Sequence, residues 1–175
     1  AAPDTLKYAS SGIGSTPHLA MAMMARMAGI ELVHIPYRGV PQAVTDLIAG
    51  RVDLAFVNSS TALTYVDNGQ MHALGVSSAG RSALTRNLPA IAETVPGFEV
   101  LNWQGLAAPR GTPRPIIDQL NAALKVALDE PRTVQEFAKL GGTPSWSTPE
   151  ELAAMTRAEI DRWKAVVRDA NITAQ

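Results

Sequence analysis

The sequence has no cysteine, few aromatic residues and no excess of charge of either sign. Without cysteine it can form neither disulfides nor thiolate zinc sites, so a packed core has to stabilise it. Lys and Arg total 15 and Asp and Glu total 16, a net charge of -1. This balance excludes a strongly electrostatic partnership with nucleic acid or an anionic membrane surface.

Long apolar runs are also missing. The richest stretch, residues 19–30, is interrupted by Arg26 and Gly29 and falls short of the roughly 20 residues that cross a bilayer. Residues 1–4 have neither the basic nor the apolar region of a signal peptide, as expected also of a trimmed exported protein. The chain of 175 residues, 46% of them hydrophobic, is long enough to bury a core.

Residues 1–100 alternate between predicted strands and predicted helices. Strands are expected at 6–10, 31–35, 52–57 and 72–78, with helices at 17–28, 41–49 and 60–68, the last capped by Ser59 or Ser60. This spacing is typical of βαβ units, which form a parallel sheet covered by helices on both faces. We therefore expect an α/β ligand-binding lobe over residues 1–100.

Residues 101–175 are predicted to be mostly helical. A crossover strand is expected at 98–108, a short strand at 143–147, and helices at 114–128, 131–140 and from 149 onward. Thr148 and Glu151 match a capping box at the start of the last helix. These helices have apolar faces but at most two strands to cover, so residues 101–175 are expected to be the incomplete part of a second lobe.

Polar loops follow the four predicted strands, at the edge where open parallel sheets bind ligands. They span residues 10–16, 36–39, 58–61 and 77–81 and are rich in hydroxyl, amide and glycine groups. Three of them lead into helix N-termini, whose free N–H groups and partial positive charge suit an anion. Arg38 and Arg81 are the only charges in these loops, which indicates a binding site rather than a catalytic one.

Two alternatives fit the same loops. Turn and cap chemistry explains any one loop by itself, as in a plain α/β interaction domain. Arg38 stands where a partner for the NADP 2′-phosphate would sit, which leaves an NADP- or phosphate-binding enzyme domain as the other alternative. Against it, Pro17 replaces the third glycine of a dinucleotide fingerprint, and no P-loop lysine is present. His18 either faces the ligand or bonds the local backbone.

Four segments, in unbroken order, resemble one family. They are KYASSGIGSTPHL at 7–19, VHIPYRG at 33–39, TDLIAGRVDL at 45–54 and WQGLAAPRGTP at 103–113. They are similar to segments of the tripartite tricarboxylate transporter receptors, the TctC or Bug-type periplasmic solute-binding proteins. The resemblance covers essentially the whole chain.

The resemblance implies a non-enzymatic, periplasmic receptor with a type II periplasmic-binding-protein-like α/β fold. The implied ligand is a small organic carboxylate, either a di- or tricarboxylate or an acidic amino acid, passed to a small and a large membrane subunit. No catalytic residue, metal or cofactor is implied. The ligand-binding residues carried over are Ser10, Gly12, Gly14, Ser15, Thr16, His18, Tyr37, Gly39, Asn58 and Ser59.

The sequence departs from the family at its start. Complete members are longer and begin with a lobe that contains a Pro-Pro-Gly-Gly-like loop, and nothing similar occurs here. The chain is therefore expected to be a C-terminal fragment, with one whole lobe and the returning part of the other. Closure on a ligand would need the missing lobe, and exposed apolar helix faces would favour non-native oligomers.

Overall fold

The computed structural model describes residues 6–173. These residues divide into two units, 6–102 with 162–173 (unit 1) and 103–161 (unit 2). Within the described range, no helix combines the length and the apolar character needed to cross a membrane.

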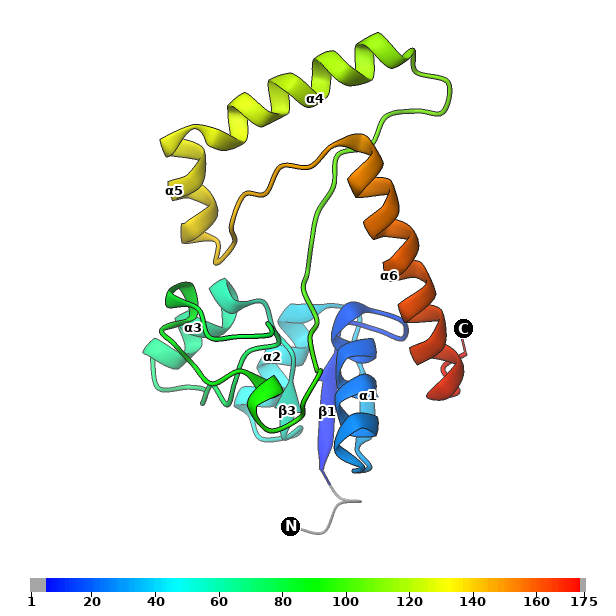
Figure 1. Ribbon diagram of the computed structural model, residues 1–175. Coiled ribbons are helices and arrows are strands. Elements are labelled where there is room, and N and C mark those ends of the chain that lie inside the picture. Colours follow the sequence, from blue (N-terminus) through cyan, green and yellow to red (C-terminus); the bar gives the residue numbers. More distant parts are fainter. Residues whose placement is uncertain (1–5, 174–175) are drawn as a thin grey trace. The chain divides into compact units, whose positions relative to one another are not determined.

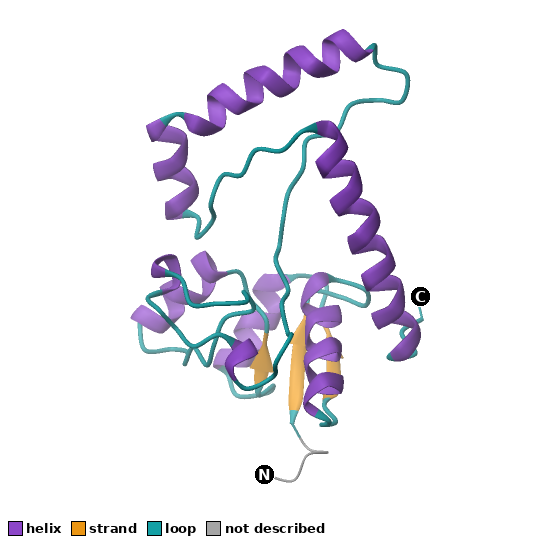
Figure 2. Ribbon diagram, in the orientation of Figure 1, coloured by secondary structure: helices purple, strands orange, loops and turns teal. Residues whose placement is uncertain are grey.

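A parallel sheet lies in unit 1 (Figure 2). Its strands are β1 (Lys7–Ser10), β2 (Val33–Pro36) and β3 (Leu54–Ala55), in the order β2-β1-β3. Tyr8 of β1 pairs with His34 on one side and with Leu54 on the other. The carboxyl end of β1 therefore lies between those of its two neighbours.

Helices connect the strands as the sequence predicts (Figure 1). They are α1 (Thr16–Ala28) between β1 and β2, α2 (Val40–Ile48) between β2 and β3, and α3 (Ser59–Asp67) after β3. α1 has a proline in its first turn and ends at Gly29, whose φ of 65° is the left-handed conformation that closes a helix. The N-cap of α3 is Asn58, so the prediction of Ser59 or Ser60 as its cap is wrong.

Alternation along the strands divides the core between the two sheet faces. Ala9 packs with Ala43 of α2 and with Val52. A second cluster joins Ala20 of α1 to Phe98 and Val100, and the methionines at 23 and 24 pack against it. Because successive strand residues face opposite sides, α1 and α2 cover opposite faces of the sheet.

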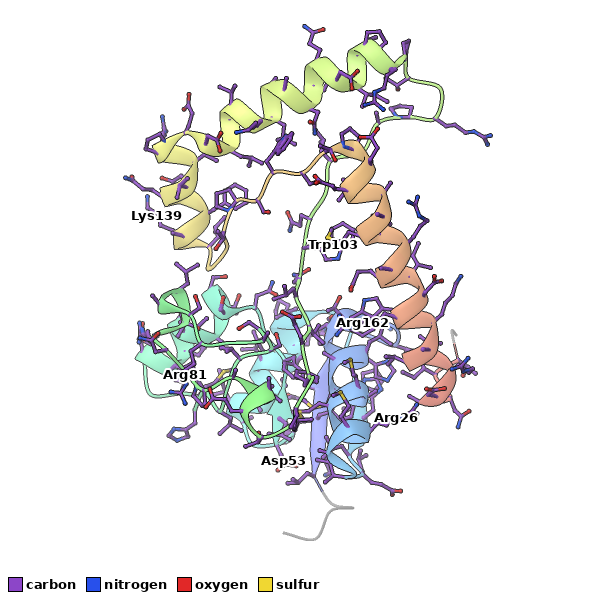
Figure 3. The ribbon with its side chains drawn as sticks, in the orientation of Figure 1. Arg26, Asp53, Arg81, Trp103, Lys139 and Arg162 are labelled. Carbon is purple, nitrogen blue, oxygen red and sulfur yellow. The ribbon has the colours of Figure 1, made fainter. Side chains whose placement is uncertain are left out.

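The C-terminal end of α6 (Pro149–Asp169) belongs to unit 1. Trp163 packs against the cluster around Phe98. Arg162, labelled in Figure 3, donates to the carbonyl oxygen of Glu99, and Arg26 of α1 forms an ion pair with Asp169. These contacts hold the C-terminal end of α6 against the rest of unit 1.

The prediction of a fourth strand at 72–78 is wrong. Only an isolated bridge joins Val76 to Ala90. The Val76 N–H donates to the Pro89 carbonyl (2.9 Å) and the Val100 N–H donates to the Ser77 carbonyl (2.8 Å). The backbone of this segment thus pairs with irregular segments instead of with β3. Two 3₁₀ turns, η2 (Ala83–Thr85) and η3 (Ile91–Glu93), lie in the same region.

Two further strand predictions are also wrong. Residues 98–108 and 143–147 are not assigned to any strand. The second segment is held by side chains instead: Asn121 Nδ2 donates to the Ser147 carbonyl (2.9 Å), and Trp146 Nε1 donates to the Asn121 carbonyl (3.2 Å).

Unit 2 consists of helices and their connections. It contains α4 (Arg114–Asp129), α5 (Pro131–Lys139) and the beginning of α6. The Thr148 N–H donates to the Glu151 carboxylate (2.8 Å), and the Glu151 N–H donates to the Thr148 hydroxyl (3.2 Å). This confirms the predicted capping box. No residue of 103–161 is buried.

Candidate functional site

The strand order places a switch point at the carboxyl end of β1. From β1 the chain crosses first to β2 and later to β3, on the other side of β1. Open parallel sheets bind ligands outside the carboxyl ends of their strands at such a point. The segments that follow β1 and β3 are residues 10–16 and 56–58. We refer to residues 10–16 as the Gly/Ser loop.

The Gly/Ser loop is held by its own hydrogen bonds. Gly12 and Gly14 have φ values of 129° and 77°, in the region that residues with a side chain rarely adopt. The Gly12 carbonyl accepts from the Ser15 N–H (3.2 Å) and from the Ser15 hydroxyl (2.7 Å). The Ser15 hydroxyl therefore closes the loop and does not cap α1.

Two stacked histidines support this loop. The rings of His18 (α1) and His34 (β2) have centroids 3.9 Å apart and planes 10° apart. The Gly14 N–H donates to His18 Nδ1 (3.0 Å), and Ser10 Oγ lies 2.7 Å from His34 Nε2. His18 is 6% exposed. Of its two predicted roles, the bond to local backbone is present, and contact with a ligand stays a prediction.

Burial favours the uncharged form of each ring. It lowers the pKa of His18 below 6.5, and, together with the charge of His18, it lowers the pKa of His34 to about 4. Tyr8, stacked on His34 with ring centroids 4.8 Å apart, has its pKa raised to about 12 by burial. Low-dielectric surroundings disfavour the charged form in all three cases. The loop consequently rests on neutral rings at neutral pH.

Helix N-termini follow all three strands. Their N-caps are Ser15, Gly39 and Asn58, and at none of these does a side chain accept from a first-turn N–H. The first backbone hydrogen bond of α1 is donated by the Leu19 N–H. The N–H groups of Thr16 and His18, which precede it, have no acceptor within residues 6–173. Free first-turn N–H groups and the helix dipole together favour an anion.

The two arginines of the predicted loops differ in whether a carboxylate neutralises their charge. Arg81, labelled in Figure 3, makes two bonds to Glu93, Nη2 to Oε2 (2.7 Å) and Nε to Oε1 (2.8 Å). The guanidinium and the Ala90 N–H lower the pKa of the Glu93 carboxyl to about 2. Arg38 is exposed, and its side chain has no partner in the described part of the chain. Arg81 is thus neutralised and Arg38 is not.

Tyr37 stands apart from the other predicted site residues. Its hydroxyl donates to Asp46 of α2 (2.8 Å), and its ring packs against the core cluster around Ala9. Its backbone N–H donates to the Ser10 carbonyl (3.0 Å) and continues the pairing of β1 with β2. The side chain of Tyr37 therefore lies on the α2 face, whereas Ser10 and His18 lie on the α1 face.

Sequence reasoning missed two residues. His34 lies within the strand predicted at 31–35 and is not among the predicted site residues, but it bonds Ser10. The strand register could have revealed this contact. His34 pairs with Tyr8, and Ser10 lies two positions after Tyr8 on the same face of β1. The second missed residue is Asn102, whose Nδ2 donates to Asn58 Oδ1 at 3.4 Å. The two residues are 44 positions apart, so no local sequence pattern predicts the contact.

Known proteins are similar to this chain in sequence and in fold. The model of the TctC family, described as the tripartite tricarboxylate transporter family receptor, matches residues 1–172. The chain belongs to the TctC receptor family. It is similar to the UPF0065 protein in the tcbD-tcbE intergenic region of Pseudomonas sp. (strain P51), with 39% identity over 98% of this chain and 52% of the relative. The TctC chain thus spans about half the length of that curated relative.

Solved structures also resemble the TctC chain. An R. palustris protein with adipate has a TM-score of 0.86 at 34% identity, covering 98% of this chain and 57% of its own. MatC from Rhodopseudomonas palustris with bound malate has a TM-score of 0.76 at 32% identity, covering 94% and 57%. The matches confirm the predicted periplasmic-binding-protein fold, and this family comprises solute-binding proteins rather than enzymes.

Proposed function

We propose that this TctC chain carries the carboxylate-binding lobe of a periplasmic receptor that delivers a small organic dicarboxylate to the membrane subunits of a tripartite tricarboxylate transporter. The observation that carries the proposal is the set of uncapped helix N-termini after the three strands. Two different dicarboxylates, adipate and malate, appear with similar structures, which supports this ligand class.

The chemistry of the loops suits a carboxylate held by neutral donors. Residues 10–16, 36–39 and 58–61 contain no Asp or Glu that would repel an anion. The N–H groups of Thr16 and His18, with the hydroxyl of Thr16, would bind one carboxylate beside the Gly/Ser loop. Asn58 and the first turn of α3 would bind the other end of the ligand. Specificity then follows from how ligand length and hydroxylation satisfy these donors.

The NADP- or phosphate-binding alternative has less support. Its strongest residue, Arg38, is exposed, and the segment that follows β1 lacks the third glycine of a dinucleotide fingerprint. The loops also offer no acid–base pair, because His18, which is buried, and His34, which is half-buried, both have lowered pKa values. A neutral binding site agrees better with these features.

The remaining site residues belong to the same proposal. We assign Ser10, Gly12, Gly14 and Ser15 to shaping the loop, and Gly39 and Ser59 to the first turns of α2 and α3. Tyr37 would contribute through its backbone, since its hydroxyl already donates to Asp46. The periplasmic location of the chain rests on the family alone.

We further propose that residues 101–175 belong largely to a second lobe that this chain contains in part. Unit 2 has helices but no strand, and none of its residues is buried, although α4 and α5 have apolar faces. A helix layer normally packs on a sheet. Supplying the N-terminal half of the Pseudomonas relative as a separate chain should shield Trp103 and Trp146 from acrylamide quenching. Unchanged quenching would contradict this organisation.

A charge-placement experiment tests the carboxylate site. Asn58→Asp puts a negative charge at the N-terminus of α3, and Asn68→Asp puts the same charge at its C-terminal end. The first change repels a bound carboxylate but suits the helix dipole, so a loss of binding cannot be explained by unfolding. We expect adipate and malate to bind Asn58→Asp at least about tenfold more weakly than wild type.

The control should leave binding within about twofold of wild type, because Asn68 lies at the far end of the helix. Isothermal titration calorimetry with adipate, malate and NADP measures all three proteins. Equal loss in the two variants would argue against the site. Saturable binding of NADP without any response to the carboxylates would contradict the carboxylate proposal and favour the nucleotide-binding alternative.

A further inference from the structure

The bond between Gly14 and His18 fixes the protonation state of His18. A backbone N–H can only donate, so the Nδ1 atom that accepts it at 3.0 Å must be unprotonated. The ring is then neutral with its proton on Nε2. A second proton on Nδ1 would place two N–H groups against each other and break the bond.

His34 supports the other half of the loop. Its Nε2 lies 2.7 Å from Ser10 Oγ, which in turn accepts from the Gly12 N–H at 3.1 Å. The two rings thus hold the two glycines whose positive φ values shape the loop. Either neutral tautomer of His34 satisfies the serine, so His18 is the more sensitive of the pair.

The surroundings give no compensation for charge on either ring. The groups that face the pair are Tyr8 of β1, which stacks on His34, and the rings themselves. No carboxylate interacts with either imidazole in the part of the chain that is described. With centroids 3.9 Å apart, a charge on one ring opposes a charge on the other.

We propose that His18 and His34 are positioning residues for ligand capture: their neutral rings hold the Gly/Ser loop in its binding form, and protonation of the pair releases the loop. The proposal rests on the carboxylate site proposed above. It predicts weaker carboxylate binding in acid. A histidine that paired directly with the anion through its charge would give the opposite direction.

The lowered pKa values agree with this direction. A state with the loop released and the rings in water has histidine pKa values near the ordinary 6.5, whereas in the folded loop that of His34 is about 4. The released state therefore binds more protons between these two values. Acidification through that window shifts the equilibrium toward release, and the loop is fully held above it.

Amide exchange of Gly14, measured by NMR without ligand, tests the positioning step. His18→Asn keeps an acceptor, Oδ1, at the place of Nδ1 but does not titrate, and His18→Leu removes the acceptor. We expect exchange of the Gly14 amide to rise about tenfold in His18→Leu and to stay near wild type in His18→Asn. His72→Asn, at an exposed histidine, is the control and should change nothing. Unchanged Gly14 exchange in His18→Leu would overturn the proposal.

Titration with adipate and malate from about pH 7.5 to about pH 4.5 tests the consequence for binding. The ligands also take up protons in this range, so each wild-type dissociation constant is divided by that of His18→Asn at the same pH. We expect this ratio to rise about tenfold or more with acid. A falling ratio would show that His18 binds the anion through its charge. If no carboxylate binds at any pH, the proposed function fails, and the Gly14 measurement still decides the role of His18.

Discussion

Unit 1 and unit 2 both contain helices with apolar side chains but differ in what covers those side chains. α1 and α2 pack on a parallel sheet and bury residues such as Ala20 and Val44. α4 and α5 bury none, and the large apolar side chains that they leave exposed are Ile116, Leu120, Val126, Val134 and Phe137. An amphipathic pattern thus predicts a helix, while a core requires a second apolar surface.

The difference also bears on the site. The Gly/Ser loop follows β1, whose last three residues are buried and which pairs with a strand on each side, so its geometry is held by a rigid scaffold. Unit 2, which buries nothing, should open locally at a lower free energy. Substitutions in the two units should therefore differ in how much they destabilise the chain.

The largest effect is expected for Phe98→Ala in unit 1. Phe98 is 0% exposed and packs with Ala20 and Val100, so its removal leaves a cavity and should lower the free energy of unfolding by about 3–5 kcal/mol. Leu120→Ala in α4 removes a side chain that is 49% exposed and should cost about 1 kcal/mol or less. Urea unfolding followed by circular dichroism measures both. Equal losses would mean that the two units share one core.

Gly12→Ala comes next, because it tests how rigidly unit 1 holds the Gly/Ser loop. The φ of 129° at Gly12 disfavours any side chain, and we expect a loss of about 1–3 kcal/mol. Gly80→Ala is the matched control: Gly80 has open space around it and no positive φ, so the change should be within about 0.5 kcal/mol. An equally small loss for Gly12→Ala and Gly80→Ala would mean that the Gly/Ser loop is mobile rather than preformed.

Thr148→Ala should affect only the start of α6, in unit 2. It removes the hydroxyl that accepts the Glu151 N–H and should destabilise this helix end by about 1 kcal/mol. Thr64→Ala, in the exposed middle of α3, is the control and should be nearly neutral. Hydrogen exchange of the Leu152 and Ala9 amides distinguishes the units. Faster exchange at Ala9 as well would show that the cap stabilises unit 1.

The smallest effect is expected from acid at the Arg81–Glu93 pair of unit 1. Arg81, together with the Ala90 N–H, lowers the pKa of Glu93 from 4.5 to about 2, so the folded chain binds this proton less readily than the unfolded chain. The stabilisation is complete above pH 4.5 and is lost as the pH falls toward 2. Glu93→Gln should remove this part of the pH dependence in thermal unfolding. Because the pair is exposed, the difference from wild type should be small and should shrink in high salt.

Local patterns sufficed to predict most helices of both units. The helix stop at Gly29, the prolines near the starts of α1 and α2 and the capping box of Thr148 and Glu151 act through neighbouring residues, so sequence reasoning could find them. The strand predicted at 72–78 failed because its backbone bonds go to Pro89 and Ile91, which no periodicity reveals.

The candidate site divides in the same way. That polar loops follow the strands could be predicted, because the loops adjoin the elements in sequence. Two other features could not be predicted: Glu93 neutralises Arg81, and Tyr37 donates to Asp46. Both depend on how separate segments pack. Which residues contact a ligand stays a prediction.

Composition and near neighbours were enough to predict the α/β class, the order of the helices, the absence of thiol chemistry and the resemblance to TctC receptors. The stacking of His18 and His34 beside the Gly/Ser loop depends instead on long-range packing. One ring comes from a helix and the other from a strand. They meet because the register of β1 with β2 and the packing of α1 on the sheet bring them to one face.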